Sequence, residues 1–463
     1  QPMTDPSGTC TLVFNGEIYN YREIRRALEQ AGTTLRTDGD SEALLMGYLA
    51  WGEGVLDRLE GMFAFAILDR RENAVVAARD PFGIKPLYLY ERPGFAMLAS
   101  EMRPMRHVTP LEPDPAALAE LIDYRWAAGR LSNFKNIVSV PGGTLLHIGL
   151  ADAAVRERRF YDPLDTLHED PTIGPDTAEE MARAAVMDSI EAHLASDVGY
   201  TVQLSGGVDS SLIAGVTEGL TDTPLRTFSL HLPGYEHDER RWRDMLVERY
   251  PFEHHELTVD GRNFADALPR ANAHMEGPSP HLGCVFLMLL CDRLAAASKV
   301  VLTGEGADEF FGGYLRYSHW RKTAWQERLG RLLPTSLLPD RWPFAGMRRL
   351  AGVDAAAFGG VYHDIGAMRA LFPEIVRAPG AREAASGRFD GFIDRLFAVD
   401  QTAYLESLLV RQDKMAMAAS VEARVPFVHL PLARVLNRIP RKILAPGRGE
   451  TKAVLKKIAE AFV

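Results

Sequence analysis

The sequence contains only three cysteines, Cys10, Cys284 and Cys291. Their number and spacing exclude a disulfide framework and a cysteine-based zinc site, so we expect buried thiols in a reducing, cytoplasmic setting. No apolar run reaches the ~20 residues that a helix needs to cross a bilayer, and we expect neither a transmembrane helix nor a signal peptide. The net charge of -10 gives the surface no bulk attraction for nucleic acid or an anionic membrane.

The length of 463 residues indicates two or three domains. Apolar strands and short amphipathic helices alternate over residues 1–150, which predicts an α+β layered domain. Strands are predicted at 11–14, 62–68, 74–78 and 86–90, with 62–68 and 74–78 joined as a hairpin, and helices are predicted at 20–31 and 42–50. Asn15-Gly16 is interpreted as a turn that ends the first strand.

The pattern changes after residue 150. Residues 151–178 are acidic, contain proline and threonine, and lack periodicity, which predicts a linker. Over 179–463, strands at 199–204, 225–230, 253–259 and 298–303 alternate with helical patterns, and residues from 316 onward are predicted to be mostly helical. This alternation predicts an α/β domain with a doubly wound parallel sheet and a helical C-terminal region.

The most distinctive motif is Ser205-Gly206-Gly207-Val208-Asp209-Ser210, between a predicted strand and a predicted helix. The glycines and successive N–H groups favour a phosphate site at a helix N-terminus, and a carboxylate there favours Mg²⁺. The motif is neither a Walker A loop nor a dinucleotide fingerprint. A tight turn with no ligand remains the structural alternative.

A second motif follows the strand at 298–303 and reads TGEGADEFFGGY from Thr303 to Tyr314. Ligands of doubly wound sheets lie at the carboxyl ends of strands, so we expect both motifs to open onto one crevice. An acidic first turn of a helix would explain this segment alone. It would not explain why both motifs follow strands.

The two motifs together resemble the synthetase domain of class B asparagine synthetases, which are ATP-pyrophosphatases. The runs LVRQDKM from Leu409 and VEARVPF from Val421 are similar to the family's C-terminal helical segment, although Arg411, Lys414, Glu422 and Arg424 could equally form a structural ion-pair cluster. The resemblance implies that Asp209 and Asp308 hold Mg²⁺ and that Glu305 acts near the acyl-adenylate. It assigns ATP binding to Leu204, Ser205, Gly206, Gly207, Val208, Asp209, Ser210, Leu230, Thr303 and Gly304.

Four segments of residues 1–150 resemble the class II glutaminase domain, which implies a truncated Ntn-hydrolase-type sandwich. They are FNGEIYN from Phe14, GDSE from Gly39, GMFAFA from Gly61 and RDPFGIKPLY from Arg79. Asn15 and Gly16 would form an oxyanion hole, and Glu17 and Asp40 would bind glutamine together with them. A plain Asn15-Gly16 turn and a helix cap at Asp40 are the structural alternatives.

The sequence lacks the first and the last part of the family pattern. The family uses a mature N-terminal cysteine as nucleophile, and Gln1 matches a point a few dozen residues later; Cys10 has no free amine beside it. Val463 precedes the stretch with the family's catalytic lysine, and Lys452 matches an earlier position. We therefore expect a truncated chain without glutaminase activity and with incomplete synthetase activity.

The resemblance implies a glutamine-dependent ligase that uses ATP and Mg²⁺ to convert aspartate to asparagine, with a homodimer left open. A sugar acid or natural-product carboxylate is the alternative acceptor, because the chain departs from the family pattern in two segments. Met275-Glu276-Gly277-Pro278-Ser279-Pro280-His281 stands where the family has an acidic stretch, and Pro426-Phe427-Val428-His429-Leu430 stands where the family often continues Pro-Phe-Leu-Asp-His. A β-lactam-forming cyclase and a non-catalytic binding protein are further alternatives. The retained Asn15, Gly16, Glu17 and Asp40 argue against the cyclase.

Overall fold

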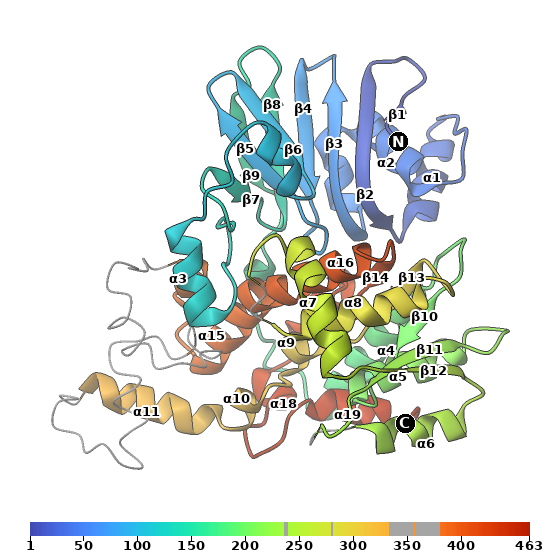
Figure 1. Ribbon diagram of the computed structural model, residues 1–463, viewed down its shortest axis with the longest axis vertical. Helices are drawn as coiled ribbons and strands as arrows, with labels where there is room; N and C mark the ends of the chain where they lie inside the picture. Colours follow the sequence, from blue (N-terminus) through green and yellow to red (C-terminus); the bar gives the residue numbers. More distant parts are fainter. Residues whose placement is uncertain (236–238, 279–280, 333–355, 357–379) are drawn as a thin grey trace.

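The computed structural model describes residues 1–235, 239–278, 281–332, 356 and 380–463. Antiparallel sheets with a few helices form the upper, N-terminal part, and a parallel sheet surrounded by helices forms the lower, C-terminal part (Figure 1). None of the described helices combines the length and apolarity that a bilayer crossing requires.

The N-terminal part contains a six-stranded antiparallel sheet of order β1-β2-β3-β4-β8-β9 and a three-stranded sheet of order β6-β5-β7. The strands are β1 (Met3–Thr4), β2 (Cys10–Ile18), β3 (Gly61–Asp69), β4 (Ala74–Arg79), β5 (Tyr88–Arg92), β6 (Phe95–Ala99), β7 (Ile137–Ser139), β8 (Thr144–Gly149) and β9 (Val155–Arg159). Helices α1 (Tyr21–Gln30) and α2 (Asp40–Trp51) share an apolar core with β2 and β3. The predicted helices at 20–31 and 42–50 and the hairpin of 62–68 with 74–78 are confirmed.

The predicted turn at Asn15-Gly16 is wrong, because β2 continues through both residues to Ile18. Asn15 pairs with Ala64, and Gly16 pairs with Phe63 in β3. The partner strand begins more than 40 residues later in the chain, so no local pattern announces the pairing. The same lack of local signal explains β9, which lies within the predicted linker 151–178 and extends the sheet by pairing with β8.

The C-terminal sheet is parallel, with order β12-β11-β10-β13-β14. Its strands are β10 (Thr201–Gln203), β11 (Arg226–His231), β12 (Glu253–Thr258), β13 (Val300–Leu302) and β14 (Glu422–Arg424). From β10 the chain adds β11 and then β12 on one side of the sheet. It then returns to the other side of β10, where it adds β13 and β14. This arrangement is the doubly wound topology that the sequence predicts, with its switch point between β10 and β13.

Most of the described residues from 316 onward are helical, which confirms that prediction, and strand β14 is a short exception within this segment. Only three residues form the strand, and they pair with β13 through Val300–Glu422, Val301–Ala423 and Leu302–Arg424. So short a strand after a long helix has no period-2 pattern to reveal it.

Helices cover both faces of the parallel sheet. Val301 packs with α8 and α16 in one apolar cluster, whereas its neighbour Leu302 packs with α5 in another, as alternation along a strand requires. The principal helices are α4 (Pro175–His193), α5 (Val208–Glu218), α6 (Arg240–Arg249), α7 (Gly261–Met275), α8 (Gly283–Leu294), α16 (Leu405–Met417) and α19 (Ala453–Ala459). The C-terminal part also contains α9 (Ala307–Phe311), α10 (Leu315–Ser318), α11 (Trp320–Leu332), α14 (Ala381–Ser386), α15 (Phe392–Val399), the π-helical η5 (Asp400–Tyr404), α17 (Leu430–Leu436) and α18 (Arg441–Leu444), whereas α3 (Pro115–Tyr124) belongs to the N-terminal part.

The two parts share a buried interface. Tyr19, Met62, Phe82 and Ile84 of the N-terminal part belong to the main apolar core of the C-terminal part. Two ion pairs with largely buried side chains cross the interface to α16, Arg79–Glu406 at 3.0 Å and Lys85–Asp413 at 2.8 Å. The shared apolar core and the two buried ion pairs together hold the two parts in a fixed arrangement.

Three buried rings also meet at this interface. The ring of Tyr19 lies 4.1 Å from that of His193 and 6.0 Å from that of His429. Tyr19 Oη and Nε2 of both histidines have no hydrogen-bond partner, and Glu60 is the nearest acid, 3.7 Å from His429 Nε2. Burial lowers the pKa of His193, helped by His429 and Arg424, and lowers the pKa of His429 to about 4.

Acid is therefore expected to weaken the folded state through these histidines. Because their pKa is depressed on folding, the unfolded chain binds more protons, and stability falls as pH drops from about 6.5 toward 4. His429→Asn is expected to remove about 2 kcal/mol of the loss in unfolding free energy between pH 7 and pH 5. Urea denaturation at the two pH values measures this difference, and equal losses in variant and wild type would contradict it.

Candidate active sites

A cavity of about 400 Å³, the strand-end pocket, opens at the switch point of the parallel sheet. It is lined by the segments that follow β10, β11 and β13 at their carboxyl ends. Seven of the ten residues predicted to bind ATP line it: Leu204, Ser205, Asp209, Ser210, Leu230, Thr303 and Gly304. The structure thus brings the two sequence motifs together, as expected for a doubly wound sheet.

The loop after β10 is held by its own serines. Ser205 N donates to Ser210 Oγ at 3.1 Å, and Gly207 N donates to Ser205 Oγ at 3.0 Å. The remaining predicted residues Gly206, Gly207 and Val208 shape the loop without lining the cavity. Gly206 has φ +97°, and a Cβ there would lie 2.6 Å from the carbonyl oxygen of Glu239. Glycine is therefore required at 206 by the close approach of the start of α6.

Asp209 and Asp308 face the same lysine in this pocket. Lys452 Nζ lies 2.5 Å from Asp209 Oδ2 and 2.9 Å from Asp308 Oδ1. The second oxygen of Asp209 is buried without a hydrogen-bond partner. Burial raises the pKa of Asp209 to about 6, which Lys452 opposes and Asp308 reinforces. Gly313 packs directly on the pair, because a Cβ there would lie 1.7 Å from Asp308 Oδ1.

This donor set fits a divalent cation that is shared with a polyphosphate. Within the described ranges no group of three or more histidine, cysteine or acidic side chains could hold a metal by itself. Mg²⁺ is ordinarily held by one or two carboxylates together with phosphate oxygens and water. Asp209 and Asp308 supply the two carboxylates, and the unpartnered oxygen of Asp209 is available to a ligand.

Glu305 lines the same pocket and is paired with helix α16. Arg411 Nη2 donates to Glu305 Oε1 at 2.5 Å. Burial lowers the pKa of Arg411, but the negative charge of Glu305 helps to raise it, and the net effect is an increase. The guanidinium therefore stays charged. The sequence leaves it undecided whether Arg411 acts at the site or forms a structural ion pair. In the structure, Arg411 pairs with Glu305, the carboxylate predicted to act near the acyl-adenylate.

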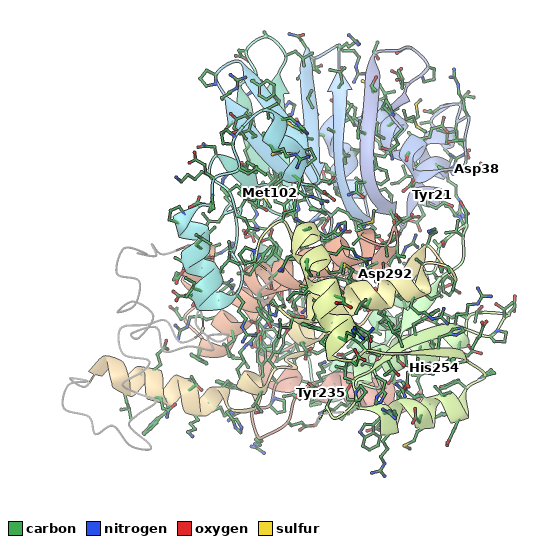
Figure 2. The ribbon with its side chains drawn as sticks, in the orientation of Figure 1. Tyr21, Asp38, Met102, Tyr235, His254 and Asp292 are labelled. Atoms are coloured by element: carbon green, nitrogen blue, oxygen red, sulfur yellow. The ribbon has the colours of Figure 1, made fainter. Side chains whose placement is uncertain are left out.

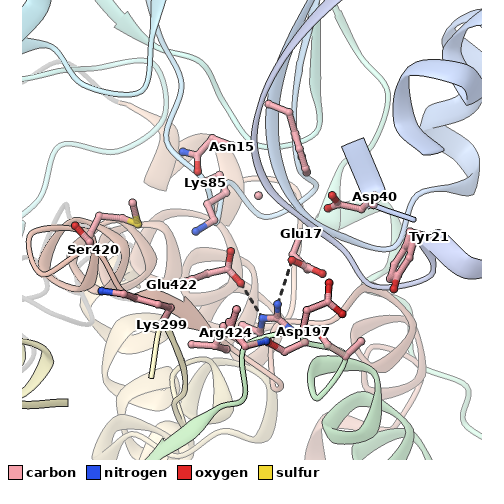
Figure 3. A pocket seen from close by; sticks show the side chains of 18 of the residues that line it. Asn15, Glu17, Tyr21, Asp40, Lys85, Asp197, Lys299, Ser420, Glu422 and Arg424 are labelled. Carbon is pink, nitrogen blue, oxygen red and sulfur yellow. Dashed lines mark hydrogen bonds and ion pairs between the residues drawn. The ribbon is translucent and has the colours of Figure 1, made fainter. Parts of the chain in front are cut away.

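A second cavity of about 540 Å³, the interdomain pocket, lies between the N-terminal sheet and the parallel sheet (Figure 3). Tyr21 and Asp38 mark its side of the molecule, whereas Tyr235 of the strand-end pocket lies well below them (Figure 2). Its N-terminal wall includes all four residues predicted to bind glutamine, Asn15, Gly16, Glu17 and Asp40, together with Lys85. Its other wall comes from the C-terminal part and includes Asp197, Lys299, Ser420, Glu422 and Arg424.

Two acids of this pocket are held in different ways. Glu17 Oε2 lies 3.1 Å from Arg424 Nη2, and Asp40 Oδ2 accepts a hydrogen bond of 3.1 Å from Ile18 N. Burial raises the pKa of Glu17 to about 7, opposed by Arg424 and reinforced by Asp40 and Glu422. Burial also raises the pKa of Asp40, which the hydrogen bond from Ile18 opposes. The predicted helix cap at Asp40 is thus a link from the start of α2 to the end of β2.

Gly16 is fixed by the approach of β3. Its φ is +150°, and a Cβ would lie 2.0 Å from the carbonyl oxygen of Met62. Gly16→Ala is expected to separate β2 from β3 and lower the unfolding free energy by about 2 kcal/mol. Urea denaturation tests this, with Gly8→Ala as control, because nothing lies within 4 Å of a Cβ at Gly8 and its φ of +73° carries similar strain. A Gly16→Ala protein no less stable than Gly8→Ala would contradict the expectation.

Sequence reasoning missed two groups of pocket residues. Lys452 precedes α19, with a positive φ of 53° that lysine seldom adopts, and only its match to another family position drew attention to it. The C-terminal wall of the interdomain pocket was also missed, because residues near 197, 299 and 422 meet only in the tertiary structure. Cys10 is fully buried in β2 and does not line the interdomain pocket, in agreement with its rejection as nucleophile.

The segment that departs from the family's acidic stretch is partly described. Glu276 is buried, pairs with Lys414 Nζ at 2.5 Å and accepts a hydrogen bond of 2.6 Å from Arg103 N. Its carboxylate therefore ties α16 to the N-terminal part. Ser279 and Pro280 of the same segment lie outside the described residues. His429, the other departure, lies in the cluster with Tyr19 and lines neither pocket.

Comparisons with known proteins agree with this geometry. The sequence model of asparagine synthase matches residues 181–463, and that of a glutamine amidotransferase domain matches residues 1–161. The chain is 29% identical to glutamine-hydrolysing asparagine synthetase 1 of Bacillus subtilis, over 100% of this chain and 75% of that protein. It is 31% identical to a protein of Mycobacterium tuberculosis that carries a glutamine-hydrolysing asparagine synthetase name, over 98% of this chain and 72% of that protein.

Among solved structures, the allosteric regulatory enzyme of purine biosynthesis matches 56% of this chain and 62% of its own, with 17% identity and a TM-score of 0.27. So low a score carries no argument. The two family models together match residues 1–161 and 181–463, and both relatives align with at least 98% of this chain. The chain belongs to the asparagine synthase family, with a glutamine amidotransferase domain ahead of its synthetase domain.

Proposed function

We propose that this chain carries the active sites of a glutamine-dependent asparagine synthetase, which converts aspartate, ATP and glutamine to asparagine, AMP, pyrophosphate and glutamate. One observation carries the proposal: Asp209 and Asp308 follow strands β10 and β13 and share one lysine in the strand-end pocket. We also propose a glutaminase domain up to β9 and a synthetase domain from α4 onward.

In the strand-end pocket, each group has a separate task in adenylate formation. The first turn of α5 and the loop at Ser205 direct backbone N–H groups toward the phosphates of ATP. Asp209 and Asp308 would hold Mg²⁺, which would neutralise charge on the departing pyrophosphate when bound. Lys452 supplies a further positive charge at the same carboxylates. Glu305, held by Arg411, lies where it can contact the acyl group or the incoming amine.

In the interdomain pocket, the proposed task is to bind and polarise glutamine. The amide of Asn15 and the N–H of Gly16 would stabilise the oxyanion, and Glu17 and Asp40 would accept the ammonium group. Both acids line the cavity beside Asn15. An ionised carboxylate is required for the ammonium contact, so the protonation state of Glu17 decides how well glutamine binds.

A different acceptor acid is the second candidate. Glu276 lies where the family's acidic stretch is expected, but both of its oxygens are engaged by Lys414 and Arg103. Glu276 is also buried and lines neither the strand-end pocket nor the interdomain pocket, so it is not placed to bind the α-amino group of aspartate there. A sugar acid or a natural-product carboxylate would need no such contact.

Pyrophosphate release by the full-length protein with ATP, magnesium and ammonium chloride tests the proposal, because ammonium bypasses glutamine hydrolysis. Aspartate-dependent release of pyrophosphate and AMP in equal amounts is the expected result. Release with another carboxylic acid alone would select the second candidate. Release of ADP and phosphate, or no nucleotide binding by calorimetry, would contradict both.

A further inference from the structure

One residue of the C-terminal part reaches into the proposed glutamine site. Arg424, at the end of β14, is only 2% exposed. Its guanidinium lies 3.1 Å from Glu17 and 2.8 Å from Glu422, and it donates to the carbonyl oxygen of His193 at 2.9 Å. Figure 3 shows Glu17 and Glu422 both directed at this guanidinium. Each of the three guanidinium nitrogens thus has a partner at the boundary of the two domains.

The main chain of Arg424 is fixed by the neighbouring strand. Thr303 N donates to the carbonyl oxygen of Arg424 at 3.0 Å, and Arg424 pairs with Leu302 in the parallel sheet. Thr303 itself lines the strand-end pocket. The sheet of the synthetase domain therefore fixes the main chain from which the guanidinium reaches Glu17.

We propose that Arg424 is a positioning residue for glutamine, which acts from the synthetase domain by holding Glu17 charged and in place in the interdomain pocket. This inference rests on the proposed function, because it assumes that Glu17 binds the ammonium group of glutamine. The glutaminase site is then completed only when the synthetase domain is docked against it.

The charges around Glu17 give the proposal a distinctive consequence. Burial raises the pKa of Glu17, Arg424 lowers it, and Asp40, Glu422 and Asp197 raise it, to a net value of about 7. The other charged groups that line the cavity are Asp38, Lys85 and Lys299. Removing Arg424 should raise the pKa of Glu17, and neutralising Glu422 should lower it. If Arg424 and Glu422 only stabilised the fold, changing them would not shift the pKa of Glu17 in opposite directions.

The experiment is calorimetric titration of L-glutamine into the chain at several pH values from 5.5 to 8.5. Glutamine binding by the wild type is expected to weaken below a midpoint near the pKa of Glu17. For Arg424→Met, the midpoint is expected to rise by about one unit, with binding about fivefold weaker at pH 7. For Glu422→Gln, it is expected to fall by about one unit, with binding about fivefold tighter at pH 6.

Two further variants keep the proposal testable if Arg424→Met does not fold. Arg424→Lys keeps the positive charge but loses the planar set of guanidinium donors. Its midpoint is expected to lie between those of the wild type and Arg424→Met. Glu17→Gln removes the titrating group, so the pH dependence between 6 and 8 should disappear. Unmoved midpoints in Arg424→Lys and Glu422→Gln, with wild-type glutamine binding intact, would overturn the role of Arg424 alone. No glutamine binding by the wild type at any pH would instead overturn the glutamine half of the proposed function and this inference with it.

Discussion

Replacing Asp209 by asparagine is expected to weaken the binding of magnesium ATP about 100-fold, or about 3 kcal/mol. Asp209 is the more buried of the two carboxylates that share Lys452, and one of its oxygens has no partner within the protein. Without its charge, Asp308 alone would remain to hold the metal against the phosphates. Asp308→Asn is expected to act in the same direction.

Calorimetry with ATP in excess MgCl₂ and then in excess EDTA separates a metal role from a structural one. In EDTA, Asp209→Asn is expected to bind ATP at least as well as the wild type, because the lost carboxylate repels phosphate. Asp222→Asn, an exposed acid on the same domain, is the matched control and should behave as wild type in both conditions. Equal losses for Asp209→Asn with and without magnesium would contradict the assignment of Asp209 as a metal ligand.

The largest expected loss of stability comes from Lys85→Met. The side chain of Lys85 is 1% exposed, and its ammonium lies 2.8 Å from the carboxylate of Asp413, whose side chain is 7% exposed. Burial lowers the pKa of Lys85, but Asp413 raises it to a net increase, so the pair is charged. Removing one partner leaves a buried carboxylate without its counter-ion, which is expected to cost about 3 kcal/mol of unfolding free energy.

Urea denaturation of the single and double variants measures this cost. Lys85→Met with Asp413→Leu is expected to recover part of the loss, because no lone charge remains buried. Lys135→Met is the control, since it breaks the exposed pair Lys135–Glu112 and should change stability by less than about 1 kcal/mol. A double variant less stable than Lys85→Met alone would show that Lys85 and Asp413 stabilise the interface separately.

Local signals in the sequence determined the elements whose pattern is complete within a short window. The amphipathic spacing of Ile24 and Leu28 gave α1, and the hairpin of β3 and β4 followed from two apolar runs around Asp69–Asn73. The glycine-rich loop before α5 and the acidic segment after β13 were placed correctly at strand ends, because the doubly wound topology brings those ends to one edge. The expectation that Asp209 and Asp308 share a pocket is confirmed for that reason.

Other features depended on partners that are distant in the chain. Asn15-Gly16 carries a strong turn signal, yet pairing with β3 keeps it in a strand. Strand β14 forms only because β13 offers it an edge, and Arg424 reaches Glu17 only because the two domains pack together. Sequence thus determined which residues can bind phosphate, carboxylate or ammonium groups, since that chemistry belongs to the side chains. The tertiary structure alone decided which of them meet, because hydrogen-bond partners and buried charges are set by contacts between segments that can lie more than 400 residues apart.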